Sequence, residues 1–170
     1  MEKKMPDLIT VATAECFTHG KVAREVHAFA RGYPLGYPWE INRDKARVSL
    51  VCGLFIPTIS GVESVLRFEP MKPICAPEGI KVYDQKRDLA MAVQMATTVK
   101  KMTRSQIGIG TSAGIGTGGI AVVTNDLTIT ATTDVHADLR TSDAELIMRR
   151  QEAGVNEALR LFQHLLKNGF

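Results

Sequence analysis

A glycine-rich segment at residues 108–119 carries the strongest chemical signal in the sequence. Six of its twelve residues are glycine, and three hydroxyl side chains lie among them. Glycine lets backbone N–H groups converge on a ligand without steric obstruction, and such concave sites favour anions, phosphate above all. The segment lacks the Lys-Ser/Thr ending of a Walker A loop, so we interpret it as a phosphate-binding loop of another kind, with a tight structural turn as the alternative. The predicted ligand contacts are Gly110, Thr111, Ser112, Gly114, Gly116, Thr117 and Gly118.

Cys16 is the predicted nucleophile. It follows a predicted strand and precedes a predicted helix, and the N-terminus of a helix favours the thiolate, the reactive form of cysteine. His19, three residues later, is placed to act as a base or to orient a substrate. Glu15 and Thr18 are weaker candidates in the same turn. The alternative is that Cys16 is a small buried apolar residue, as most unpaired cysteines are.

A third group of polar residues, at positions 134–140, follows a predicted strand. Asp134, His136, Asp138 and Arg140 alternate along it, and we expect Arg140 to contact an anionic group of a ligand. Alternating polar residues at the end of a strand are more often a solvated edge, and no metal site is predicted from them.

The elements that must position these residues follow from apolar periodicity. Buried strands are expected at 8–14, 48–56 and 107–110, and a hairpin at 120–124 and 127–133. Helices are expected from Thr18 or His19 to near Gly32, at 57–68, at 84–102, and from a capping box at 142–145 to about residue 166. Arg149 and Arg150 are assigned to the solvated face of the last helix. The order of elements predicts one layered α/β domain spanning residues 1–170.

The composition narrows the class of protein. The chain has 170 residues and a net charge of +3 without a basic cluster, which argues against nucleic-acid binding. No signal peptide or membrane span is predicted. Cys16, Cys52 and Cys75 lie far apart, which argues against a disulfide framework and a zinc ribbon, so Cys52 and Cys75 are interpreted as structural. A cytoplasmic protein is expected.

Four segments resemble the HcgF family of methanogenic archaea: residues 13–20 (TAECFTHG), 79–84 (GIKVYD), 107–116 (IGIGTSAGIG) and 134–140 (DVHADLR). The resemblance covers nearly the whole chain in order. It implies a role in building the iron-guanylylpyridinol cofactor of [Fe]-hydrogenase, with guanylylpyridinol as the bound ligand. In this family the cysteine of the AEC segment, here Cys16, forms a thioester with the pyridinol carboxylate. The resemblance also implies a homodimer and a hand-off to other cofactor-assembly proteins.

A fainter likeness reaches the C-terminal domain of CinA-type proteins, which hydrolyse nicotinamide mononucleotide and carry an A-E-S-C-T-G-G segment after the first strand. It implies a three-layer α/β/α sandwich. Three functions therefore stay open: thioester formation, CinA-like amide hydrolysis, and nucleotide binding without chemistry. For the first, the substrate must arrive activated, for example adenylated, so that AMP leaves when the thiolate attacks. The glycine loop would hold a phosphate, and Thr18 or a backbone N–H near the helix start would stabilise the oxyanion.

Overall fold

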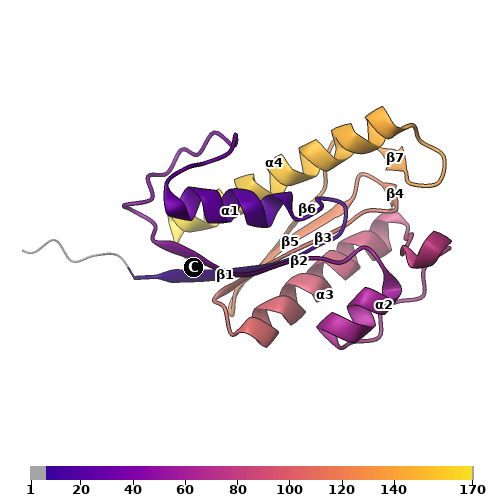
Figure 1. The fold of residues 1–170 in the computed structure, drawn as a ribbon, viewed down its shortest axis with the longest axis horizontal. Helices are drawn as coiled ribbons and strands as arrows, with labels where there is room; N and C mark the ends of the chain where they lie inside the picture. The colour runs from indigo at the N-terminus through magenta and orange to yellow at the C-terminus, as the bar shows by residue number, and fades with distance from the viewer. Residues whose placement is uncertain (1–6, 170) are drawn as a thin grey trace, which may run out of the picture.

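The centre of the molecule is a five-stranded mixed sheet, seen nearly edge-on in Figure 1. A computed structural model describes residues 7–169. The strand order is β2 (Val48–Phe55), β1 (Ile9–Glu15), β3 (Ile107–Ser112), β5 (Gly119–Val123) and β6 (Thr128–Ala131). The first three strands run parallel, and β5 and β6 are antiparallel to their neighbours. Beyond the sheet, β4 (Ile115–Gly116) pairs with β7 (Ala137–Asp138).

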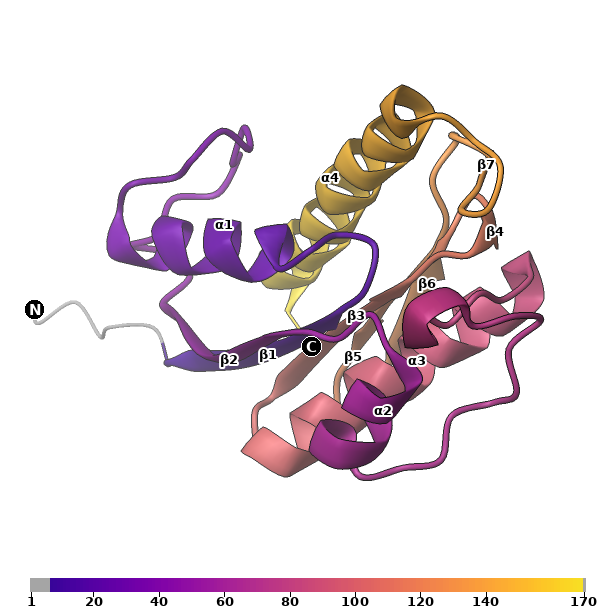
Figure 2. The same cartoon turned by 45° about the vertical axis from the view of Figure 1, so that its right-hand side comes forward.

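Helices cover both faces of the sheet (Figures 1 and 2). On one face lie α1 (Lys21–Arg31) and α4 (Ala144–Asn168). On the other lie α3 (Gln85–Thr103), α2 (Ile59–Gly61) and the π-helical turn η1 (Val62–Leu66). A short 3₁₀ turn, η2 (Pro77–Gly79), precedes α3. The predicted α/β/α sandwich is confirmed.

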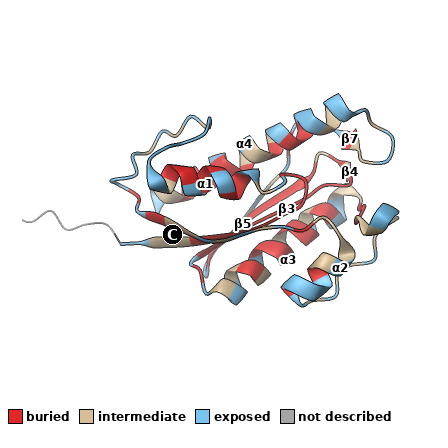
Figure 3. Cartoon of the chain, viewed as in Figure 1, coloured by how far each residue is buried: buried red, intermediate tan, exposed pale blue. Residues whose placement is uncertain are grey.

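The core lies in two layers, one on each side of the sheet (Figure 3). Successive side chains of a strand point to opposite faces, so Val11 packs in the layer under α1 and α4, whereas Ala12 and Ala14 pack in the layer above α3. This burial on both faces explains why the first strand reads as a continuous apolar run rather than an alternating one.

The predicted helices and strands are present, with differences at their ends that matter for the site. The first helix begins at Lys21 and not at Thr18 or His19, because His19 and Gly20 have left-handed backbone conformations with φ of 54° and 76°. The predicted helix at 57–68 divides into α2 and η1. The last helix is capped by Asp143, which accepts a hydrogen bond from the N–H of Leu146, and not by the serine before it.

Half of the glycine-rich segment belongs to the central sheet, and residues 113–118 form the connection between two of its strands. Strand β3 continues to Ser112, and β5 begins at Gly119. A Cβ atom on Gly110 would lie 2.0 Å from the carbonyl oxygen of Ala92 in α3, and one on Gly108 would lie 2.1 Å from that of Ala96. These glycines let the backbone of α3 pack directly on the backbone of β3.

The spacing of the glycines matches the spacing of the helix. Gly119 meets the carbonyl of Asp88, which stands one helical turn before Ala92 and two before Ala96. Two residues of strand advance about 6.6 Å and four residues of helix about 6 Å, so Gly108 and Gly110 stay in step with the turns of α3. Packing against the backbone of α3 therefore explains three of the six glycines, Gly108, Gly110 and Gly119.

Candidate functional site

A cavity of about 200 Å³ opens beside Cys16. Cys16, Phe55 and Ala113 bring it to the carboxyl ends of the parallel strands β1, β2 and β3, where α/β proteins place their ligands. We call it the Cys16 cavity. Its lining residues are Cys16, Phe17, His19, Phe55, Pro57, Ile80, Ala113, Leu139, Ile147, Arg150 and Gln151.

Cys16 is held from the neighbouring strand. Its backbone N–H donates to the carbonyl oxygen of Thr111 at 3.0 Å and to the Thr111 hydroxyl at 3.1 Å. The thiol is free, and 6% of the residue is exposed. Cys16 therefore lies on a fixed backbone at the wall of a cavity, which is the geometry a nucleophile needs. Cys16 directly follows β1, as expected, but the helix after it begins at Lys21 and not at Thr18 or His19, so the thiol lies farther from the helix N-terminus than predicted.

Glu15 occupies the helix N-terminus in place of the thiolate. Its fully buried carboxylate accepts hydrogen bonds from the N–H groups of Val22 at 3.2 Å and Ala23 at 2.8 Å, in the first turn of α1. It also accepts from the hydroxyls of Thr13 and Thr18, at 2.9 and 2.6 Å. Burial raises the pKa of Glu15, and these hydrogen bonds oppose the rise. Glu15 does not line the Cys16 cavity, so its position gives it the role of a buried helix cap.

Thr18 belongs to the same buried network. Besides the bond to Glu15, its hydroxyl lies 2.9 Å from the hydroxyl of Thr111. Thr18 is fully buried and is not among the residues that line the cavity. Both hydroxyls are thus engaged within the protein, and stabilisation of an oxyanion by Thr18 stays a prediction.

His19 lines the cavity together with Cys16. Its ring packs on Phe55 with 4.8 Å between ring centroids. Burial lowers the pKa of His19, and the nearby charge of Lys21 lowers it further, so the neutral imidazole dominates at pH 7. Within residues 7–169, no hydrogen bond joins this ring to Cys16. A neutral imidazole can accept a proton, and the role of His19 as a base stays a prediction.

Arg150 is buried, so the prediction that it lies on the solvated face of the last helix was wrong. Only 1% of its surface is exposed, and it lines the Cys16 cavity. Its Nη1 donates to the carbonyl oxygens of Gly114, Gly116 and Ala137, at 3.1, 2.9 and 2.7 Å. A signal was available in the sequence: Arg150 stands four residues before Gly154, on the stripe that continues through buried Ala158 and Phe162.

The turn after β3 is fixed by a buried acid. Asp88 accepts hydrogen bonds from the Ser112 hydroxyl at 2.8 Å and from the N–H of Gly114 at 2.6 Å. Burial raises the pKa of Asp88 to about 6, against the effect of these two bonds and the charges of Arg150 and Lys81. Both backbone polar groups of Gly114 are thus hydrogen-bonded to buried charged side chains: its N–H donates to Asp88, and its carbonyl accepts from Arg150.

Thr117 is also partnered within the protein. The N–H and hydroxyl of Thr117 both donate to Gln85, at 2.7 and 2.9 Å. A Cβ on Gly116 would lie 2.4 Å from Gln85 Oε1, and one on Gly118 would lie 3.0 Å from the Phe17 ring. The segment contributes Ala113 to the cavity wall. Contact between its predicted residues and a ligand stays a prediction, and the close packing supplies another reason for the glycines.

Arg140 lies next to Leu139, which lines the cavity. Its guanidinium forms two hydrogen bonds with the Asp138 carboxylate, at 3.0 and 2.7 Å, and the pair lies at the surface. These bonds hold the pKa of Asp138 down at about 2. Arg140 is therefore neutralised locally, and its contact with a ligand stays a prediction. Across residues 7–169, no three His, Cys, Asp or Glu side chains gather as metal ligands would.

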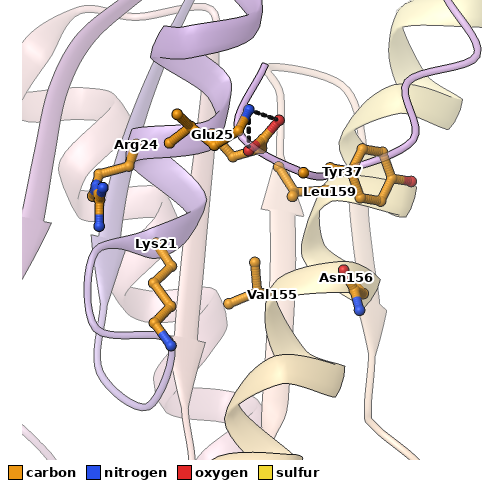
Figure 4. Close-up of a pocket in the computed structure, with 9 residues that line it drawn as sticks. Lys21, Arg24, Glu25, Tyr37, Val155, Asn156 and Leu159 are labelled. Carbon is orange, nitrogen blue, oxygen red and sulfur yellow. Dashed lines mark hydrogen bonds between the residues drawn. The ribbon is translucent and has the colours of Figure 1, made fainter. Parts of the chain in front are cut away.

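A second pocket, of about 250 Å³, lies between α1 and α4 (Figure 4). Figure 4 shows Lys21 and Arg24 on α1, with Val155 and Asn156 across from them on α4. Glu25 is engaged: its carboxylate accepts from the N–H of Leu35 at 3.0 Å and from the Trp39 indole at 2.9 Å. No cysteine lines this second pocket, so the Cys16 cavity is the better candidate for nucleophilic chemistry.

Comparisons with known proteins agree with this fold. The chain resembles the competence or damage-inducible protein of Enterobacter asburiae, with a TM-score of 0.56 over 93% of this chain and 87% of that one, at 18% identity. A CinA superfamily protein of Klebsiella pneumoniae gives a TM-score of 0.56 at 15% identity, over 95% and 89% of the two chains. At this identity the likeness shows the fold alone, and it confirms the CinA-like architecture. No helix in the described part of the chain is long and apolar enough to cross a membrane.

Sequence relatives come from methanogenic archaea. A "UPF0254 protein" of Methanocorpusculum labreanum is 51% identical over 94% of this chain and 93% of its own length. Its counterpart in Methanothermobacter thermautotrophicus strain Delta H is also 51% identical, over 94% and 100%. The relative in Methanocaldococcus jannaschii is 33% identical over 96% and 99%. A family model described as "FeGP cofactor biosynthesis protein HcgF" matches residues 8–166. The chain belongs to the HcgF family of FeGP cofactor biosynthesis proteins.

Proposed function

We propose that Cys16 accepts the acyl group of an activated guanylylpyridinol and holds it as a thioester. The observation that carries the proposal is a free cysteine on a fixed backbone, at the wall of a mainly apolar cavity that also contains a buried arginine. Membership in a family that builds the FeGP cofactor supports guanylylpyridinol as the ligand. The thioester would keep the acyl carbon electrophilic for hand-off to other assembly proteins.

The reaction is a nucleophilic acyl substitution with no change of oxidation state. The Sγ of Cys16 attacks the carbonyl carbon of an acyl adenylate, and a C–S bond forms. The mixed-anhydride C–O bond breaks, and AMP leaves with its electron pair. The thiol proton passes to His19, whose neutral ring lines the cavity. An unactivated carboxylate does not acylate a thiol, so the adenylating step lies upstream.

The size of the cavity determines which part of the ligand enters it. Pockets for whole drug-sized ligands measure roughly 300–1,000 Å³. The Cys16 cavity, at about 200 Å³, has room for the pyridinol end. The nucleotide would then lie outside, towards the loop that carries Leu139 and Arg140. This arrangement places the reacting carbon beside Cys16.

Mass spectrometry of the intact protein tests the proposal. Incubation of the wild type with adenylated guanylylpyridinol should add the acyl mass, and hydroxylamine should remove it, because it cleaves thioesters but not thioethers. Cys16→Ala should carry no adduct, whereas Cys52→Ala, the matched control with a partly exposed free thiol, should be labelled like the wild type. A full adduct on Cys16→Ala would place the nucleophile elsewhere. Release of nicotinate mononucleotide from nicotinamide mononucleotide by the wild type would instead favour the CinA-like amidase.

A further inference from the structure

Arg150 is a buried cation without a counter-ion. It is 1% exposed, and no carboxylate within residues 7–169 lies within 4.0 Å of its guanidinium. One nitrogen, Nη1, donates to three backbone carbonyls. The Nε atom is fully buried and has no hydrogen-bond partner. A buried charge is costly unless it is paired and hydrogen-bonded, so an arginine in this condition calls for an anion.

The nearest acids are engaged elsewhere. Asp88 accepts from Ser112 and Gly114, and Asp138 is paired with Arg140. Both act on Arg150 only through their more distant charges. These two distant carboxylates therefore favour the charged form of Arg150, but no carboxylate in residues 7–169 forms a direct ion pair with it.

The guanidinium is fixed in the cavity wall. Its Cζ atom lies 6.0 Å from the centroid of the Phe17 ring, which also lines the cavity. Phe17 is itself packed closely against α4, since a Cβ on Gly154 would lie 2.3 Å from this ring. Together with the three carbonyl bonds, this packing holds Arg150 and Cys16 on the walls of one small cavity.

We infer that Arg150 is the anion-recognising residue of the Cys16 cavity and that its partner is the carboxylate or acyl oxygen of the ligand that enters there. The identity of that ligand rests on the proposed function. The position beside Cys16 favours the acyl end over the nucleotide phosphate, because the cavity is too small to take both. Arg150 would then orient the acyl carbon towards Sγ and favour negative charge on its oxygen during attack.

Calorimetric titration with two ligands tests the inference. Guanylylpyridinol carries the carboxylate, and its primary carboxamide has a similar shape but is neutral and carries an NH₂ donor in place of one acceptor oxygen. The wild type should bind the acid at least about tenfold more tightly than the amide, as expected for a charge-assisted hydrogen bond. Arg150→Gln should lose this preference, and Arg150→Lys should retain part of it. Arg149→Gln, the exposed neighbour, is the matched control and should behave like the wild type.

The outcomes separate this inference from the proposed function. Cys16→Ala should keep the preference for the acid, because the preference needs no covalent bond; it would do so even if no thioester ever formed. Equal binding of acid and amide by the wild type would overturn the assignment of Arg150, and this result requires no variant to fold. Loss of GMP binding in folded Arg150→Gln, with the preference for the acid unchanged, would assign Arg150 to the phosphate and also overturn it.

Discussion

Replacing Gly110 by alanine should loosen the packing of α3 on the sheet. The added Cβ would lie 2.0 Å from the carbonyl oxygen of Ala92, and ordinary contact begins at about 3.4 Å, so the two backbones must separate by about 1.4 Å. Neither a strand paired on both sides nor a helix that buries Met91 and Met95 can move locally by that distance. The cost therefore falls at the upper end of the roughly 1–3 kcal/mol seen for overpacked cores.

A smaller effect in the unfolded chain opposes this cost. Alanine restricts the unfolded backbone more than glycine does, which returns about 0.4–1 kcal/mol. We expect the free energy of unfolding to fall by about 2 kcal/mol, and the Tm by about 4–8 °C for a chain of this length. Urea and thermal denaturation followed by circular dichroism measure both values.

The matched control is Gly36→Ala, because nothing lies within 4 Å of a Cβ added there. It should leave the Tm unchanged or slightly raised. If Gly110→Ala has the same Tm as Gly36→Ala, the packing argument is wrong. If Gly110→Ala with an unchanged Tm also no longer binds guanylylpyridinol, the result would favour the phosphate-binding interpretation of the glycines over the packing interpretation.

Two further predictions concern the buried acids. Asp88 binds its proton more tightly in the folded protein, with a pKa of about 6, than in the unfolded chain at 3.8, so its ionisation destabilises the fold as the pH rises between those values. From about pH 4 to pH 7, the free energy of unfolding of the wild type should therefore fall relative to that of Asp88→Asn by about 2 kcal/mol, and a pH-independent difference would contradict the assignment. Glu15→Ala should cost about 2–6 kcal/mol, because it leaves the N–H groups of Val22 and Ala23 buried without partners. Asp143→Ala, which removes an exposed cap, should cost only about 1 kcal/mol in the same urea titration, and equal losses would refute the buried-cap role.

The sequence by itself determined the succession of elements and the family. Apolar residues at a spacing of two or nearly four place strands and helices locally, and the periodicity of α3 and α4 predicted both helices to within two or three residues. The short motifs around Cys16 and in residues 107–116 identified the relationship to HcgF proteins before any fold was known. Cys16 was also recognisable as the reactive candidate, since it follows a buried strand at the edge where α/β sites form.

The tertiary structure decided what the other conspicuous residues do. Gly108 and Gly110 serve the contact between β3 and α3, which depends on how a helix and a strand pack against each other and cannot be read from either segment alone. Glu15 caps a helix that starts later than its local pattern predicts, because His19 and Gly20 adopt left-handed conformations that delay it. Arginine is a residue type usually found at the surface. The packing of α4 over β4 and β7 nevertheless buries Arg150 in the wall of the cavity that Cys16 also lines. Such roles arise from contacts between residues far apart in the chain, whereas local periodicity reports only which face of an element is covered.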